Sequence, residues 1–141
     1  MKASPKGFSL LELMVVLVII GVLVAIAVPS YSMYLLRANR SAAQGFMMQV
    51  ANKQAQYILD ARNYAVGADA LEDAKLKLTV PPDVRPLYDI TVENSAGGST
   101  VESPPKFTVR GTPKSGTKQA GDGVLILRHD GSKQRGATNG W

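Results

Sequence analysis

The hydrophobic pattern divides the chain of 141 residues into two different parts. Every residue from Leu13 to Val28 is apolar or glycine, and the longer stretch from Phe8 to Val28 carries one charge, on Glu12. At about 1.5 Å per residue, residues 8–28 form a helix of roughly 30 Å, the thickness of a bilayer's hydrocarbon core. The pattern therefore predicts a membrane-spanning helix.

Beyond Pro29 the apolar residues recur at spacings of three, four or seven, which is one stripe of an α-helix. The stripe consists of Leu35, Ala38, Ala42, Phe46, Val50, Tyr57 and Ala61. We therefore expect one helix from Phe8 to Asp60, about 80 Å long. Residues 8–28 would lie in the membrane, and residues 29–62 would offer one face to a globular head. The Met47-Met48 pair is assigned to core packing.

Residues 63–86 have the glycine and proline content of a connecting loop, with one short helical turn expected at residues 70–75. Residues 87–141 then hold three candidate strands, Leu87–Val92, Lys106–Arg110 and Val124–Leu127. Tyr88, Ile90 and Val92 alternate on one face of the first strand. The expected fold class is α+β, with a long helix packed on a small antiparallel sheet whose other face is solvated.

The N-terminal residues Met1–Gly7 are short and basic, and Lys2 and Lys6 would stay on the cytoplasmic side of a membrane. An ordinary secretory signal has its small-residue cleavage site after the apolar stretch, where this chain has Pro29, Ser30 and Tyr31. Any cut is therefore expected before the apolar stretch, which makes residues 1–7 a leader peptide.

Glu12 is the unusual residue of the apolar stretch, because an unpaired carboxylate at membrane depth costs on the order of a few kcal/mol. A cut after Gly7 would create an α-amino group on Phe8, four positions before Glu12. In a staggered stack of parallel helices, the Glu12 carboxylate of one subunit can meet the Phe8 amine of its neighbour. The alternative is that Glu12 lies near the interface and is merely solvated.

Charge is distributed in blocks. Residues 60–102 hold eight acids against four bases, whereas residues 106–141 hold seven bases against two acids. One interpretation is electrostatic matching within or between subunits, and the other is a surface for DNA or another polyanion. The candidate phosphate contacts are Lys114, Lys118, Arg128, Lys133 and Arg135.

Enzyme chemistry has little support in the sequence. The chain has no cysteine and one histidine, His129, which cannot supply a zinc site without further ligands and is expected at the surface. It contains neither a G-x-S-x-G nucleophile elbow nor a phosphate-binding P-loop. We therefore expect no catalytic residue, no metal and no cofactor.

The segment GFSLLELMVVLVIIGVLVAIAVPSY, residues 7–31, resembles the class III signal of type IV prepilins. The resemblance implies that a prepilin peptidase cleaves between Gly7 and Phe8 and methylates the Phe8 amine. It also implies that Glu12 governs recruitment into a fibre. Gly21 and Pro29 occupy positions where pilins weaken the helix, so the segment between them is expected to lose helicity in assembled fibres.

The later segments LYDITV and KFTVRGTPKSGTKQAGDGVLILRHDG, with the terminal Trp141, resemble the PilE-type minor pilins. That group closes its C-terminal loop with two cysteines, and this chain has Asp122 or Gly123 near the first position and Gly140 at the second. A disulfide typically contributes about 2–4 kcal/mol, so packing of Trp141, hydrogen bonds or fibre neighbours must hold this loop.

These resemblances imply a structural subunit of a type IV pilus, expected to be a minor pilin that assists pilus assembly, adhesion, twitching motility or DNA uptake. The alternatives are a major pilin, a type II secretion pseudopilin and a pilus-tip DNA receptor. The expected partners are the prepilin peptidase, other pilin subunits and the inner-membrane assembly machinery. The expected location is the inner membrane, with the head in the periplasm, and then the extracellular pilus.

Overall fold

The computed structural model describes residues 7–141, so the predictions for Lys2 and Lys6 and most of the expected leader lie outside the described residues. The chain forms two compact units, the first ending at Leu35 and the second comprising Leu36–Trp141. One long helix, α1 (Leu10–Ala61, 52 residues), contributes to both.

The start of α1 is set by a side-chain cap on Ser9. The Glu12 backbone N–H donates to the Ser9 hydroxyl oxygen at 3.2 Å, and the Leu13 N–H donates to the Ser9 carbonyl at 3.3 Å. Serine followed three residues later by glutamate is the sequence pattern of a capping box. The expected start at Phe8 is therefore wrong by two residues, because Ser9 caps the helix and Leu10 is its first residue.

The first unit exposes nearly all of its apolar side chains. Leu17, for example, is 68% exposed and Ile26 is 64% exposed. By length and composition this part of α1 is able to cross a membrane. Such a surface is stable in lipid or against other apolar helices, and it would be unfavourable in water.

Gly21 and Pro29 do not interrupt the helix in this single chain. Near Pro29, the Ser30 hydroxyl donates to the Ile26 carbonyl at 3.1 Å, and the Ser32 hydroxyl donates to the Pro29 carbonyl at 2.8 Å. Both are local bonds from a serine hydroxyl to a carbonyl three or four residues earlier, and neither reaches the Ala25 carbonyl, which loses its helical partner because Pro29 has no N–H. The expected loss of helicity concerns assembled fibres and stays a prediction.

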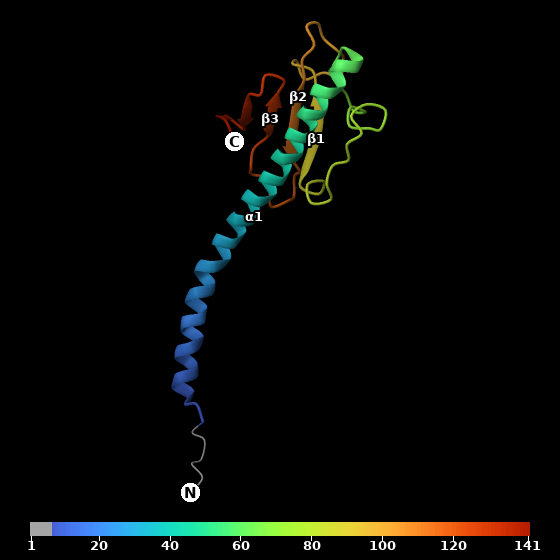
Figure 1. The fold of residues 1–141 in the computed structure, drawn as a ribbon. Helices are drawn as coiled ribbons and strands as arrows, with labels where there is room; N and C mark the ends of the chain where they lie inside the picture. The colour runs from blue at the N-terminus through green and yellow to red at the C-terminus, as the bar shows by residue number, and fades with distance from the viewer. Residues whose placement is uncertain (1–6) are drawn as a thin grey trace. The chain divides into compact units, whose positions relative to one another are not determined.

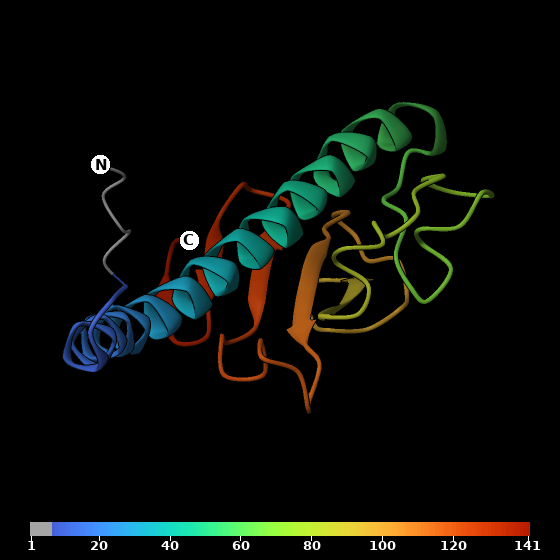
Figure 2. The ribbon, with the colours of Figure 1, turned by 90° about the horizontal axis from the view of Figure 1, so that it is seen from below.

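In the second unit, one face of α1 is buried against the sheet (Figure 2). Its buried residues are Ala43, Phe46, Met47, Val50 and Gln54. The predicted stripe is confirmed at Phe46 and Val50 and is wrong at Ala38 and Ala61, which are exposed.

The physical reason for that error is rotation along the helix. Steps of four residues turn by about 40° around the axis, so a stripe built on such steps drifts away from a short contact face. Of the methionine pair, Met47 is fully buried in the core, but Met48 is 45% exposed, so the packing assignment holds for Met47 only.

The sheet has five antiparallel strands in the order β1-β2-β3-β4-β5. The strands are β1 (Tyr88–Glu93), β2 (Thr108–Pro113), β3 (Leu125–Arg128), β4 (Lys133–Arg135) and β5 (Thr138–Asn139). The three predicted strands are present with shifted ends, and β4 and β5 were missed because they are short and polar. The α+β fold class is confirmed (Figure 1).

The register decides which side chains meet the helix. Tyr88, Ile90 and Val92 of β1 are buried together with Val109 of β2 and Leu125 of β3. Gly111 lies at the closest approach, since a Cβ placed on it would come within 3.2 Å of both the Met47 sulfur and the Ile90 side chain. Charged residues such as Asp89 and Arg110 alternate with this apolar set, which places them on the open face.

The connecting loop between α1 and β1 is tied to both of them. The buried Gln54 amide donates to the Ala65 carbonyl at 2.5 Å and accepts from the Ala65 N–H at 2.9 Å. The Gly67 N–H donates to the Val92 carbonyl at 2.9 Å and so joins the loop to the edge of β1. The helical turn expected at residues 70–75 is wrong, since this segment forms successive turns.

The two hydrogen bonds between Gln54 and Ala65, called the Gln54 clamp, can be tested by Gln54→Met. This substitution keeps the side-chain length but leaves the buried Ala65 N–H and carbonyl without their partners. We expect a loss of roughly 2–4 kcal/mol in the free energy of unfolding. Denaturant titration of the full-length chain in detergent micelles measures it. Gln56→Met, at an exposed position on the same helix, should change stability by under about 0.5 kcal/mol. Equal effects of the two substitutions would contradict the clamp.

Candidate functional site

The N-terminal candidate residues lie around the first turn of α1. Phe8 is 80% exposed, and Glu12 is exposed and lies in the first helical turn. A carboxylate in this position is favoured by the positive end of the helix dipole. The chain thus presents an apolar helix whose first turn carries a single accessible carboxylate, a group that a cation on another helix can approach.

The second candidate site is a polar cluster in the second unit, centred on Asp122 in the β2–β3 loop. The Asp122 side chain is 4% exposed. From α1, the Arg40 Nε donates to Oδ1 at 2.9 Å and to Oδ2 at 2.8 Å, and Arg40 Nη2 also bonds Oδ1. From β1, the Tyr88 hydroxyl donates to Oδ2 at 2.5 Å.

Two further side chains complete the cluster. The buried Gln119 amide donates from Nε2 to Asp122 Oδ2 at 2.8 Å and to the Leu36 carbonyl at 3.1 Å. Arg135 of β4 places Nη1 3.7 Å from Asp122 Oδ1. The carboxylate therefore joins the β2–β3 loop to a helix and two strands. We call these residues, Arg40, Tyr88, Gln119, Asp122 and Arg135, the Asp122 cluster.

The electrostatics of the cluster favour a charged aspartate. Burial alone would raise the pKa of Asp122, but the hydrogen bonds from Arg40, Tyr88 and Gln119 outweigh it, so the pKa lies below its ordinary value. Burial, followed by the bond to Asp122, raises the pKa of the Tyr88 hydroxyl, which therefore keeps its proton. At neutral pH the cluster holds one carboxylate between two guanidinium groups.

Asp122 lies near a position where the resemblance implied a cysteine, and its role in holding the loop was missed from the sequence. The partners are far apart in the chain, since Arg40 and Asp122 are separated by 82 positions, so no local pattern indicates the pairing. Of the three ways suggested for holding the loop, hydrogen bonding is confirmed by this cluster.

Trp141 provides a second attachment at the C-terminus. Its indole N–H donates to the Ile126 carbonyl at 3.1 Å, and the Lys133 ammonium lies 4.8 Å from the centre of the indole ring. The Gly140 N–H donates to the Lys133 carbonyl at 2.8 Å. These contacts hold the last residues against β3 and β4, so packing of Trp141 is confirmed as well.

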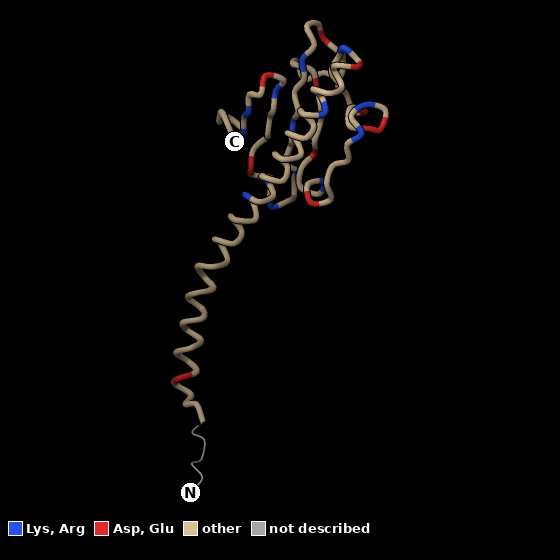
Figure 3. Tube along the Cα trace, in the orientation of Figure 1, with Lys and Arg blue, Asp and Glu red and all other residues tan. Residues whose placement is uncertain are grey.

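The five basic residues proposed for polyanion binding do not form one patch. Lys114 and Lys118 lie in the β2–β3 loop, and Arg128 lies on the open face of the sheet, where it donates to Gln134 at 3.2 Å. Lys133 and Arg135 pair in register with Leu127 and Leu125, which places them on the opposite, helix-side face. Of the nine residues in β3, β4 and β5, three are basic and none is acidic, and Figure 3 marks Lys and Arg in blue and Asp and Glu in red along the trace.

Lys118 and Arg135 do come together at a hollow of about 500 Å³ beside the Asp122 cluster. Arg40 and Asp122 line the same hollow, as do Leu36, Gly121, Gly123 and Thr138. Three cations and one carboxylate thus surround it. We call this the basic hollow.

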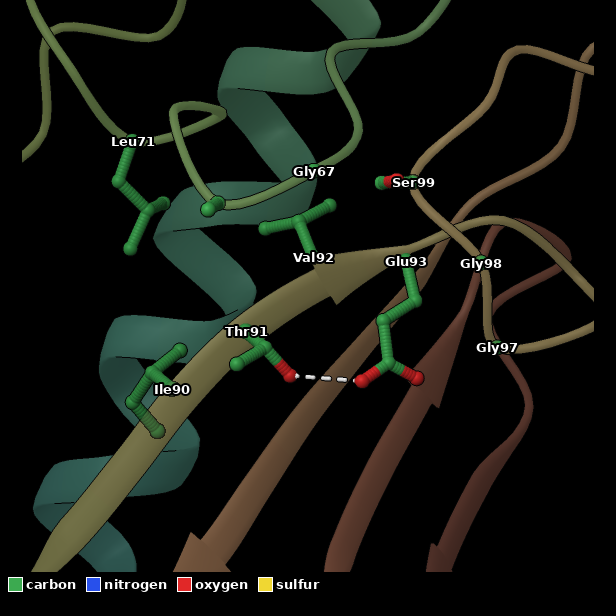
Figure 4. A pocket seen from close by; sticks show the side chains of 10 residues that line it. Gly67, Leu71, Ile90, Thr91, Val92, Glu93, Gly97, Gly98 and Ser99 are labelled. Atoms are coloured by element: carbon green, nitrogen blue, oxygen red, sulfur yellow. Dashed lines mark hydrogen bonds between the residues drawn. The ribbon is translucent and has the colours of Figure 1, made fainter.

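A different hollow, of about 360 Å³, lies at the edge of β1 between the connecting loop and residues 97–99 (Figure 4). Leu71, Ile90 and Val92 contribute apolar surface, and the Thr91 hydroxyl donates to Glu93 at 3.0 Å. Among the residues that line it, Glu93 is the single ionisable side chain, so it lacks the paired acid and base that catalysis by proton transfer requires.

A long helix with an exposed apolar first part, packed further along on a small antiparallel sheet, defines the class of type IV pilins. Comparison with known families agrees with this class. A model described as the prokaryotic N-terminal methylation motif matches residues 2–28, and one described as the type IV minor pilin ComP, DNA uptake sequence receptor, matches residues 29–123. The chain belongs to this ComP family of type IV minor pilins.

Among individual relatives, a type IV major fimbrial protein FimA of Dichelobacter nodosus is 40% identical over 62 residues, which cover 44% of this chain and 40% of the relative. Another FimA of that organism is 44% identical over 55 residues, or 36% of this chain and 34% of the relative. The chain thus spans about two fifths of the length of these curated relatives. Type IV pilins are structural subunits that polymerise with other pilins, and the chain is not an enzyme.

The Asp122 cluster predicts that Asp122→Asn destabilises the second unit by about 2–3 kcal/mol at pH 7, because two guanidinium groups are left around a neutral amide. Partial exposure of Arg40 and Arg135 keeps the loss below that of a fully buried pair. Fluorescence of Trp141, the chain's single tryptophan, follows unfolding in denaturant. Asp89→Asn, at an exposed position of β1, is the control and should have little effect.

The same variant should alter the pH dependence of stability. Because the pKa of Asp122 is lower in the folded chain, its contribution is complete above the ordinary aspartate pKa and is lost as the pH falls through the folded value. The stability difference between the natural chain and Asp122→Asn should therefore shrink below about pH 4. A difference that stays constant from pH 7 to pH 3 would contradict this assignment.

Proposed function

We propose that the chain is a minor subunit of a type IV pilus whose helix joins the fibre core and whose sheet unit binds the DNA backbone. The observation that carries the proposal is the family match over residues 29–123, whose description names a minor pilin and a DNA uptake sequence receptor. The excess of bases in residues 106–141 supports the part of the proposal that concerns DNA.

The first step is processing. A prepilin peptidase would cut between Gly7 and Phe8 and methylate the new amine, in line with the methylation motif matched at residues 2–28. The precursor would be located in the inner membrane, with its sheet unit on the periplasmic side. The inner-membrane assembly machinery would then add it to the extracellular fibre.

The second step is polymerisation. Moving the helix from lipid to a core of other apolar helices exchanges similar contacts, so the net hydrophobic gain is small. A directional interaction must then set the stagger, and the Glu12 carboxylate paired with a neighbour's Phe8 amine supplies one in a low dielectric. Gly21 and Pro29 would let the helix between them loosen as subunits pack.

The third step is contact with DNA. Lysine and arginine side chains that contact phosphates release counterions, so binding of this kind falls steeply as salt is added. Lys114, Lys118 and Arg128 are the candidates that lie in the β2–β3 loop or on the open face. Nothing in their arrangement specifies bases, so the proposal concerns the backbone.

A major pilin and a type II secretion pseudopilin are the alternatives within the same class. The fimbrial relatives match over about two fifths of their length, so their role as major subunits does not carry over to this chain.

The assembly step predicts that Glu12→Ala and Glu12→Gln remain in the membrane but enter fibres at less than about a tenth of the natural level. Glu12→Gln keeps the side-chain volume and the backbone bond to Ser9, so it isolates the charge. Quantitative mass spectrometry of sheared fibres gives the ratio to the most abundant pilin and the methylation of Phe8. Normal incorporation of Glu12→Gln would refute the pairing, and a dominant ratio for the natural chain would make it the major subunit.

The DNA step predicts that the full-length chain in detergent micelles binds a 30-base-pair duplex and that log K falls linearly with log salt, by about 0.9 for each phosphate contacted. Fluorescence anisotropy across a chloride series measures both quantities. Absence of binding at low salt, with the chain shown to be folded, would remove DNA from the proposed function and leave the structural role.

A further inference from the structure

We infer that the basic hollow is a seat for a single phosphate group, which in the proposed function is one phosphate of the DNA backbone. The inference rests on the proposed function for the source of the phosphate, but the chemistry of the seat follows from the residues around it.

The first argument is charge. Arg40, Lys118 and Arg135 line the hollow with one carboxylate, Asp122, which leaves two positive charges in excess. Asp122 already accepts bonds from Arg40, Tyr88 and Gln119 and is 4% exposed, so it lies beneath the accessible surface of the hollow. An arriving anion would therefore meet the cations before it meets the carboxylate.

The second argument is the set of available donors. Arg40 donates hydrogen bonds to Asp122 from Nε and Nη2, and its Nη1 takes no part in those bonds. The Arg135 side chain is 36% exposed, with Nη1 3.7 Å from the carboxylate, which is beyond an ordinary hydrogen bond. Lys118 is exposed, and Thr138 adds a hydroxyl. Guanidinium, ammonium and hydroxyl groups together are the donors that phosphate oxygens prefer.

The third argument is space. Gly121 and Gly123 line the hollow, and a Cβ placed on Gly121 would meet nothing within 4 Å. The volume of about 500 Å³ exceeds what one phosphate group requires, so a phosphate that remains part of a polymer can enter.

The Asp122 cluster also prepares the seat. The Asp122 carboxylate binds Arg40 and attracts Arg135, so it holds two guanidinium groups around one hollow. Without it these two groups would repel each other. The loop's structural attachment and the proposed phosphate seat thus share the same residues.

The test uses the double variant Lys118→Gln/Arg135→Gln, which removes the two outer cations and keeps Arg40 and Asp122 in place. The control is Lys53→Gln/Lys77→Gln, which removes two exposed lysines away from the hollow and lowers the net charge equally. Denaturation of each full-length chain in detergent micelles at pH 7, without phosphate, first establishes that both variants fold.

One arm uses inorganic phosphate alone. At constant ionic strength, phosphate in place of chloride should raise the Tm of the natural chain and of the control by about 2 °C or more. The double variant should show a smaller rise than the control, because phosphate also stabilises folded chains without a specific site. This arm needs no DNA, so it tests the seat even where the proposed function fails.

The other arm uses the duplex. In the double variant the slope of log K against log salt should be less negative than in the control by about 0.9, which is the effect of losing one phosphate contact. Phosphate stabilisation that the double variant loses, without this change in slope, would assign the seat to free phosphate. If the double variant matches the control in both arms, the inference is overturned.

Discussion

The second unit depends on one buried carboxylate that faces cations from different parts of the chain. Asp122 receives hydrogen bonds from α1, from β1 and from its own loop, and Arg135 of β4 lies close by. Removing one partner would leave buried charge without compensation, which costs more than the pair itself contributes. The β2–β3 loop and β4 are therefore held near α1 without a covalent link.

The first unit follows a different physical rule. Its apolar surface needs no specific partner, since lipid and neighbouring apolar helices solvate it almost equally. The polar features at its start are the Ser9 cap and the Glu12 carboxylate, and the proposed function assigns assembly specificity to Glu12. One chain thus combines a non-directional anchor with a sheet unit whose form depends on directional bonds.

Charge serves both stability and the proposed recognition in the second unit. The acids are mostly in residues 60–102 and the bases mostly in residues 106–141, and the sheet order keeps β1 and β4 apart. Glu93 pairs with Arg110 on the open face at 3.0 Å, so part of the electrostatic matching lies within the subunit. The remaining bases near the β2–β3 loop stay accessible for a polyanion.

The sequence by itself determined the features that depend on neighbours along the chain. The apolar run predicted a helix able to cross a membrane, the alternation of Tyr88, Ile90 and Val92 determined the core face of β1, and the signal-like segment around Gly7 and Phe8 indicated the class. These features arise from helical and strand periodicity and from transfer of apolar surface, both of which can be read from a short window.

Tertiary structure alone decided the rest. Strand β4 forms because it pairs with β3, and β5 forms because it pairs with β4, although their own residues have little strand preference. The five basic candidates lie on different faces because register determines which way each one points. Asp122 bonds Arg40, which is 82 positions away in the chain. A contact between residues so far apart produces no periodic pattern in the sequence.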